Sequence, residues 1–246
     1  HFGLRKEWLS DFLRSLQNWV GLNNLGSRQF EAMLMWLKHA ELIAGNKRTL
    51  EITKLGKKLA QYGVENITTW AVVWVNLAFN SAPIRWYTTE IPWGSTLTKP
   101  EMISKIGEMY SQSESTRKNS ITALIELLKH TPLGNEVGLG IEINEGKRKS
   151  YYKKGWDEPN SCSVLYSLYR YAEKKGKYEL TVKEFFEDPD GGPYLLFGIS
   201  QDKLERILRG LSTRGDGFIR VNIVRDLDNI FLDETVKSFE VLDFVE

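Results

Sequence analysis

Residues 25–63, LGSRQFEAMLMWLKHAELIAGNKRTLEITKLGKKLAQYG, carry the pattern on which the fold prediction depends. Ser27 precedes a stretch with helical apolar periodicity over 28–40, and two short apolar segments then flank a basic tip at 45–48. A short lysine-rich helix follows. A helix followed by a basic hairpin is the order of a winged helix-turn-helix, in which the helix enters a DNA major groove and the wing lies on the backbone.

The same order recurs from about residue 161 to the end of the chain. The expected helices lie at 163–175, 181–187 and 201–211, and the expected strands at 218–223 and 229–232. Apolar residues recur at helical spacing in the region between the two copies. The sequence therefore predicts a mainly α fold with short β-hairpins, in which two winged helix-turn-helix units are joined by a helical middle segment.

Three segments are expected along the chain. They are an N-terminal winged helix-turn-helix over 1–63, a helical middle segment over 64–145, and a basic loop with a C-terminal winged helix-turn-helix over 146–246. Within the middle segment, residues 81–97 combine prolines with tryptophan and tyrosine, which predicts an ordered aromatic loop. Residues 139–143 and 150–152 are expected to pair as strands.

Composition limits the class of protein. The formal net charge is only +1, but residues 1–60 hold ten basic and five acidic residues, and residues 146–177 hold nine basic and three acidic ones. Two basic segments in a nearly neutral chain favour localised contacts with phosphate. A single cysteine, Cys162, excludes a disulfide framework and a cysteine-rich zinc site. With no apolar run near 18 residues, we expect a cytoplasmic protein without a membrane contact.

The sharpest local signal lies between Gly146 and Gly155. Five of these eight intervening residues are basic, and two tyrosines separate them. Basic side chains bind phosphates, and tyrosine stacks on exposed bases. The alternative is a solvated hairpin whose tyrosines pack inward. The nucleic-acid-binding candidates in this segment are Lys147, Arg148, Lys149, Tyr151, Lys153 and Lys154.

The two expected recognition helices and the first wing supply further candidates. Arg28 and Gln29 begin the first helix, where such side chains reach guanine and adenine edges. Lys47 and Arg48 occupy the wing tip, where they would meet backbone phosphates. The candidates on the second expected recognition helix are its basic residues Lys203, Arg206 and Arg209. The alternative is that all of these are ordinary solvated residues. Many winged helices bind proteins instead of DNA.

Carboxylates able to hold a metal occur in two places. The weak candidates are Asp188 with Asp190, and Asp226 with Asp228. Hydrolysis of DNA usually requires carboxylates that hold Mg²⁺ or Mn²⁺ and thereby activate water. Both segments also have the composition of ordinary turns, so catalytic and metal-binding residues remain unassigned.

Several stretches resemble one known family. Its motifs are matched by Phe2-Gly3-Leu4-Arg5-Lys6-Glu7-Trp8-Leu9, by Leu25-Gly26 with Trp36-Leu37 and Leu55-Gly56, by Thr69-Trp70 through Trp86-Tyr87, and by the stretch from Asp226 to Leu232. The family is the SspB type of DNA phosphorothioation systems, formerly a domain of unknown function encoded beside phosphoadenosine-phosphosulfate-reductase-like genes. The match covers nearly the whole chain, and its motifs are structural.

The resemblance implies a DNA-binding component of a phosphorothioate modification or defence system, and within the SspB type a DNA-nicking activity is attributed to this component. Double-stranded DNA would be one partner. Sulfur-transfer proteins, phosphoadenosine-phosphosulfate-reductase-like and cysteine desulfurase, would be the others, because this chain lacks a nucleotide-binding glycine loop and a pair of cysteines. The residues assign no cofactor, and Mg or Mn would serve a nickase. The alternative is a transcriptional regulator or a protein-interaction scaffold without enzymatic activity.

Overall fold

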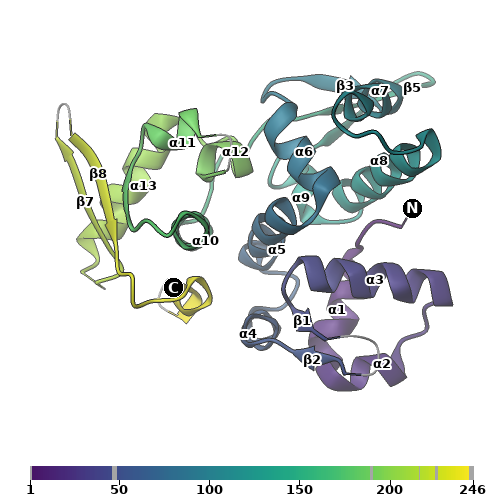
Figure 1. Cartoon of the computed structure of the whole chain (residues 1–246), viewed down its shortest axis with the longest axis horizontal. Helices are drawn as coiled ribbons and strands as arrows, with labels where there is room; N and C mark the ends of the chain where they lie inside the picture. The colour runs from purple at the N-terminus through teal and green to yellow at the C-terminus, as the bar shows by residue number, and fades with distance from the viewer. Residues whose placement is uncertain (1, 46–48, 189–190, 216, 225–226, 244–246) are drawn as a thin grey trace. The chain divides into compact units, whose positions relative to one another are not determined.

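The computed structural model describes residues 2–45, 49–188, 191–215, 217–224 and 227–243. The chain divides into two compact units, which comprise residues 1–155 and 156–246 (Figure 1). Helices dominate both units, and the strands within the described ranges form three short antiparallel sheets. The predicted mainly α class with short hairpins is thus confirmed.

The first unit begins with helices and a small hairpin. These elements are α1 (Lys6–Ser15), the 3-10 helix η1 (Leu16–Asn18), α2 (Trp19–Leu22), α3 (Ser27–His39), β1 (Ile43–Ala44), β2 (Glu51–Ile52) and α4 (Lys54–Tyr62). The buried faces of α1 and α3 repeat at three and four residues, as the sequence predicts. Ile43 pairs with Ile52 in the two-stranded sheet.

The rest of the first unit surrounds one apolar helix. Its elements are α5 (Ile67–Asn80), α6 (Ala82–Glu90), β3 (Thr96–Thr98), α7 (Lys99–Met109), α8 (Glu114–Lys129), α9 (Pro132–Asn135), β4 (Ile141–Glu145) and β5 (Arg148–Tyr152). Asn66 caps α5 by accepting a hydrogen bond from the Thr68 N–H. Residues 68–78 of α5 are all buried, which makes it the central helix of this unit.

The second unit combines helices with a three-stranded sheet. Its elements are α10 (Ser161–Lys175), β6 (Glu179–Thr181), α11 (Glu184–Glu187), α12 (Pro193–Phe197), α13 (Gln201–Thr213), β7 (Ile219–Val224), β8 (Leu227–Leu232) and the 3-10 helix η2 (Ser238–Asp243). The strand order is β6-β8-β7, with both pairs antiparallel. The single cysteine, Cys162, is buried in α10.

The predicted aromatic loop at 81–97 is wrong over most of its length, because residues 82–90 form α6. Pro83 lies in the first turn of α6, where a proline is compatible with a helix because that position needs no N–H partner. Trp86 and Tyr87 of this helix are buried in the core. The expected strand pair around 144–146 is present as β4 and β5.

The basic segment belongs to the first unit. Strand β5 lies between β3 and β4 in one sheet, and the division between the units falls after Gly155. The sequence prediction placed this segment with the C-terminal residues instead, because the pairing of β5 with the distant β3 has no local signal. Among the described residues, no helix is long and apolar enough to cross a membrane.

Candidate nucleic-acid interface

The basic segment forms a three-stranded sheet with a tight turn at its tip. In its register, Glu145 lies opposite Arg148 and Thr98 lies opposite Ser150. Two residues therefore connect β4 to β5, and the first of them, Gly146, has a φ of 64°. Glycine adopts this left-handed conformation without strain, which is why it occupies such hairpin turns. The turn projects Lys147, and Arg148 and Lys149 follow it on β5.

The cations at the tip, Lys147, Arg148 and Lys149, are exposed. The Arg148 guanidinium lies 3.9 Å from a Glu101 carboxylate oxygen, and Lys149 Nζ donates to Glu142 at 3.0 Å. The bond from Lys149 lowers the pKa of Glu142 below its ordinary value. Exposed ion pairs of this kind contribute at most about 1 kcal/mol, so a phosphate can replace the carboxylates at small cost.

Lys153 does not belong to the exposed set. Its side chain is only 1% exposed, and Nζ donates to the carbonyl oxygens of Tyr87, Thr88 and Ile91 at 2.8, 3.2 and 2.6 Å. These carbonyls end α6 and have no partner within the helix. All three ammonium donors are therefore occupied, and we remove Lys153 from the candidate interface.

Two aromatic faces complete the environment of Lys153. Nζ lies 4.1 Å from the centre of the Trp93 ring and 5.0 Å from that of Tyr87. Burial lowers the pKa of Lys153 to about 7, whereas the carbonyls, the rings and the negative end of α6 favour its protonated form. Its neighbour Lys154 is exposed and remains a candidate.

Tyr151 is also unsuited to stacking on a base. It is buried, opposite Leu97 and Glu142 in the sheet, and burial raises the pKa of its hydroxyl. The alternative prediction, that this tyrosine packs inward, is the one that the structure supports.

The two candidates at the N-terminus of α3, Arg28 and Gln29, differ in their contacts. Gln29 Oε1 accepts a hydrogen bond from the Gly26 N–H at 3.2 Å, which completes the first turn of the helix. A bidentate contact with adenine requires this same oxygen, so Gln29 must first give up its capping bond. Arg28 is exposed. The wing-tip candidates Lys47 and Arg48 lie outside the described residues.

Helix α13 likewise retains one clear candidate. Lys203 Nζ donates to the Asp157 carbonyl oxygen at 2.8 Å, and an Arg209 Nη donates to the Ile223 carbonyl oxygen at 2.8 Å. Both side chains thus fasten α13 to its own unit. Arg206 is exposed and, within the described part of the chain, its side chain makes neither a hydrogen bond nor an ion pair.

The carboxylate candidates do not form a metal site among the described residues. Asp188 accepts from the Tyr171 hydroxyl at 2.6 Å and pairs with Lys175 at 2.8 Å. Asp228 accepts from the Lys183 N–H at 2.8 Å. Asp190 and Asp226 lie outside the described residues. No group of three or more His, Cys, Asp or Glu side chains in the described ranges is placed to hold a metal ion.

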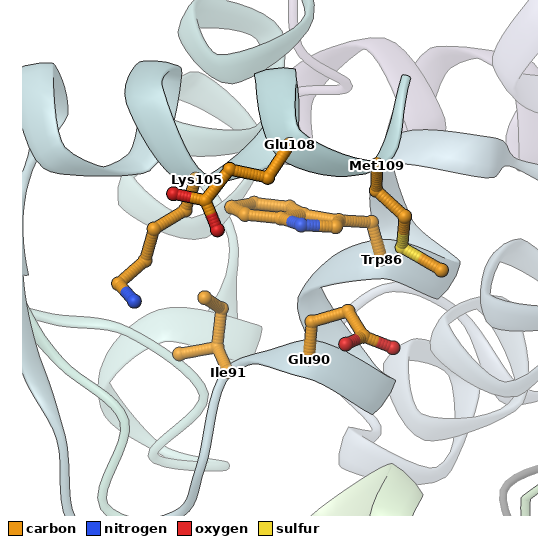
Figure 2. A pocket seen from close by; sticks show the side chains of 6 residues that line it. All are labelled: Trp86, Glu90, Ile91, Lys105, Glu108 and Met109. Atoms are coloured by element: carbon orange, nitrogen blue, oxygen red, sulfur yellow. The ribbon is translucent and has the colours of Figure 1, made fainter.

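A pocket of about 360 Å³ lies beside the basic sheet, between α6 and α7 (Figure 2). Lys105, Glu108 and Met109 of α7 lie on one side of it, and Glu90 and Ile91 at the end of α6 lie on the other. The Trp86 ring lies between these two groups. Two carboxylates against one ammonium repel an anion, so this pocket is not part of the candidate interface.

No protein-family profile and no curated protein matches this sequence. Among solved structures, the fold is similar to one described as the SspB crystal structure, with a TM-score of 0.74, 14% identity, and coverage of 99% of this chain and 84% of that one. A structure described as magnesium ion-bound SspB gives the same TM-score and coverage at 13% identity. The chain therefore has the fold of SspB over almost its whole length, and the resemblance found in the sequence is confirmed at the level of the fold.

Proposed function

We propose that this protein is the DNA-binding component of a DNA phosphorothioate modification or defence system. The observation that carries the proposal is the exposed basic tip of the β4–β5 hairpin on a chain with the SspB fold. The tip exposes Lys147, Arg148 and Lys149 to solvent, and exposed cations of this kind bind the phosphates of a nucleic-acid backbone. The fold supplies the context of phosphorothioation.

The order of elements in each unit supports the same function. In the first, α3 is followed by the β1–β2 hairpin, and in the second, α13 is followed by β7 and β8. We propose that these are winged helix-turn-helix units, with Arg28 and Arg206 facing DNA. The partners that supply sulfur are then the phosphoadenosine-phosphosulfate-reductase-like and cysteine desulfurase proteins, because the only cysteine of this chain is buried.

Magnesium enters only through the structurally similar SspB. The residues described here do not fit a metal site, because Asp188 and Asp228 are committed to other partners. We therefore assign no catalytic role to them. We predict that the isolated chain binds DNA but converts supercoiled plasmid to open circle slowly or not at all, with or without Mg²⁺ or Mn²⁺. Rapid nicking on an agarose gel would show that an unrecognised site exists.

The binding proposal is tested by changing Lys147, Arg148 and Lys149 together to Gln. The affinity for a duplex should fall for every sequence, and the slope of log affinity against log salt should flatten by about 0.9 for each phosphate that the variant no longer binds. Fluorescence anisotropy at several salt concentrations measures both. A matched control changes Lys174, Lys177 and Lys237 to Gln, three exposed lysines of the second unit that are not among the interface candidates. An unchanged slope in the hairpin variant contradicts the proposal.

A protein-interaction scaffold is the second candidate, and one observation favours it. Met35 on α3 is 45% exposed and borders a hollow of about 470 Å³ with a largely apolar lining. Exposed apolar surface beside a hollow is typical of protein contacts. If the chain fails to bind duplex DNA even at low salt, this second candidate replaces the first.

A further inference from the structure

A second hollow lies on the α7–α8 side of the first unit. These helices pack against each other (Figure 1), and the hollow, of about 630 Å³, lies over their N-terminal halves. Helix α7 contributes its first turns, and α8 contributes its own. The residues around it are Lys99, Pro100, Ile103, Ser104, Glu114, Arg117 and Lys118.

The charge of this hollow is unbalanced. Three of its residues are cations, Lys99, Arg117 and Lys118, and one is an anion, Glu114. Among the residues that the structure describes, none of the three cations forms an ion pair. At the hairpin tip, by contrast, Arg148 and Lys149 both have a carboxylate close by. A concave surface with three unpaired cations attracts an anion.

Arg117 gives an independent indication. Its Nε is buried and has no hydrogen-bond partner within the described chain. A buried donor of a charged group without a partner is costly, unless a ligand supplies the acceptor. The guanidinium lies against Gly107 of α7, where a Cβ atom would come within 1.9 Å of an Nη. Glycine at 107 therefore leaves the space that the guanidinium occupies.

The hollow adjoins the basic hairpin. Lys99 follows Thr98, which pairs with Ser150 of β5, and Arg148 reaches Glu101 in the first turn of α7. An extended polyanion that contacts the hairpin tip can therefore continue across α7. A multidentate guanidinium flanked by lysines suits the oxygens of a phosphate group, to which arginine donates two parallel bonds.

We propose that Lys99, Arg117 and Lys118 form a phosphate-binding site between α7 and α8. The phosphate is either a backbone group of bound DNA, in which case the site rests on the proposed function, or part of a free phosphate compound. In both cases Arg117 is the central ligand and the two lysines supply the surrounding charge.

The test compares two double variants with equal changes in charge, the first on α8 alone and the control with one change on each of α7 and α8. Arg117→Gln with Lys118→Gln removes cations from the hollow, whereas Lys105→Gln with Lys129→Gln removes exposed cations outside it. The first arm measures duplex affinity against salt. The second follows backbone amide shifts of α7 and α8 in NMR spectra during titration with inorganic phosphate, against chloride at equal ionic strength.

If the phosphate comes from DNA, the salt slope should flatten by about 1.8, or about 0.9 for each of two contacts, in the first variant and not in the control. If it is free, phosphate should saturate the shifts of the wild type and not those of the first variant, while the salt slope stays unchanged. If neither result is obtained, or if both double variants respond equally, the site does not exist. A wild type that binds no DNA refutes the proposed function, and the phosphate titration still decides the site.

Gly107→Ala provides a variant that keeps every charge. The added methyl group displaces the Arg117 guanidinium, whose flexible end can move without disturbing the backbone. Whichever measurement changes in the variant Arg117→Gln with Lys118→Gln should change partially in Gly107→Ala. The midpoint of thermal unfolding should stay at its wild-type value. A full response of the double variant and none of Gly107→Ala would exclude the proposed position of Arg117.

Discussion

Lys149 in strand β5 and Lys153 just after its end are the same residue type in opposite environments. Lys149, near the tip, is exposed and reaches one carboxylate, whereas Lys153, four residues later, is buried on three carbonyls and two rings. Strand alternation turns both toward the same side of the sheet. The two residues differ in their surroundings: Lys149 faces solvent, whereas Lys153 contacts the C-terminal end of α6. A basic sequence run can thus be one half exposed surface and one half structural core.

The largest effect should follow from removing the hydrogen bonds that Lys153 donates. Lys153→Met keeps the unbranched apolar stem of the side chain but leaves three carbonyls without their donor, which should lower the free energy of unfolding by about 3 kcal/mol. Urea denaturation followed by tryptophan fluorescence measures this, because seven of the eight tryptophans belong to the first unit. The neighbouring Lys154→Met is the control. Equal stability of the two variants would show that Lys153 does not hold the hairpin.

The second effect is a pH dependence of the free energy of unfolding, which should arise from Lys153 and not from the exposed lysines of the hairpin tip. Lys153 has a pKa of about 7 when folded, against 10.5 as its ordinary value, so unfolding takes up a proton between these two values. The free energy of unfolding should therefore rise with pH, by up to about 1.4 kcal/mol per pH unit, and the gain is lost as the pH falls toward 7. Lys153→Met should abolish this slope.

The pH measurement has an upper bound. Burial raises the pKa of Tyr87 well above its ordinary value, and burial raises the pKa of Tyr169 to about 12. In the unfolded chain a tyrosine loses its proton at about pH 10, whereas these two tyrosines keep theirs in the folded chain. The free energy of unfolding therefore falls as the pH rises above about 10. Urea titrations from about pH 7.5 to 9.5 avoid this overlap. A slope that persists in Lys153→Met within that window assigns the proton uptake to another group.

The smallest effect is expected at the tip. Lys149→Gln removes an exposed pair with Glu142 and should change the free energy of unfolding by less than about 1 kcal/mol. The same urea titration in low and high salt measures it, and added salt should reduce the difference further. A destabilisation as large as that of Lys153→Met would mean that the tip, too, is structural.

The sequence was sufficient for those parts of the fold whose signals are local. The period of apolar residues located α3, α5, α8 and α10, and the turn around Gly146 located β4 and β5. Helix α6 was missed because its proline and aromatic residues are also those of a loop. The placement of β5 beside β3 was missed because strands about 50 residues apart pair through tertiary contacts alone.

The candidate site was predictable in composition but not in accessibility. Residue type and spacing identified the basic run, yet they do not tell which lysine meets the end of a helix. Gln29, Lys203 and Arg209 likewise have polar partners that become visible only in the folded chain. The α7–α8 cations were overlooked for the opposite reason. Lys99 is 18 residues away from Arg117 in the sequence, and only the packing of two helices brings both to one hollow.

The burial of Cys162 in α10 makes the hairpin accessible to selective chemical labelling. Its side chain is 4% exposed, and a buried thiol in apolar surroundings reacts slowly with maleimides. A cysteine introduced in place of Lys147 would then be the preferred reactive thiol of the folded chain. A dye attached there would lie at the tip of the turn, where its fluorescence reports the approach of a polyanion without any change to the native thiol.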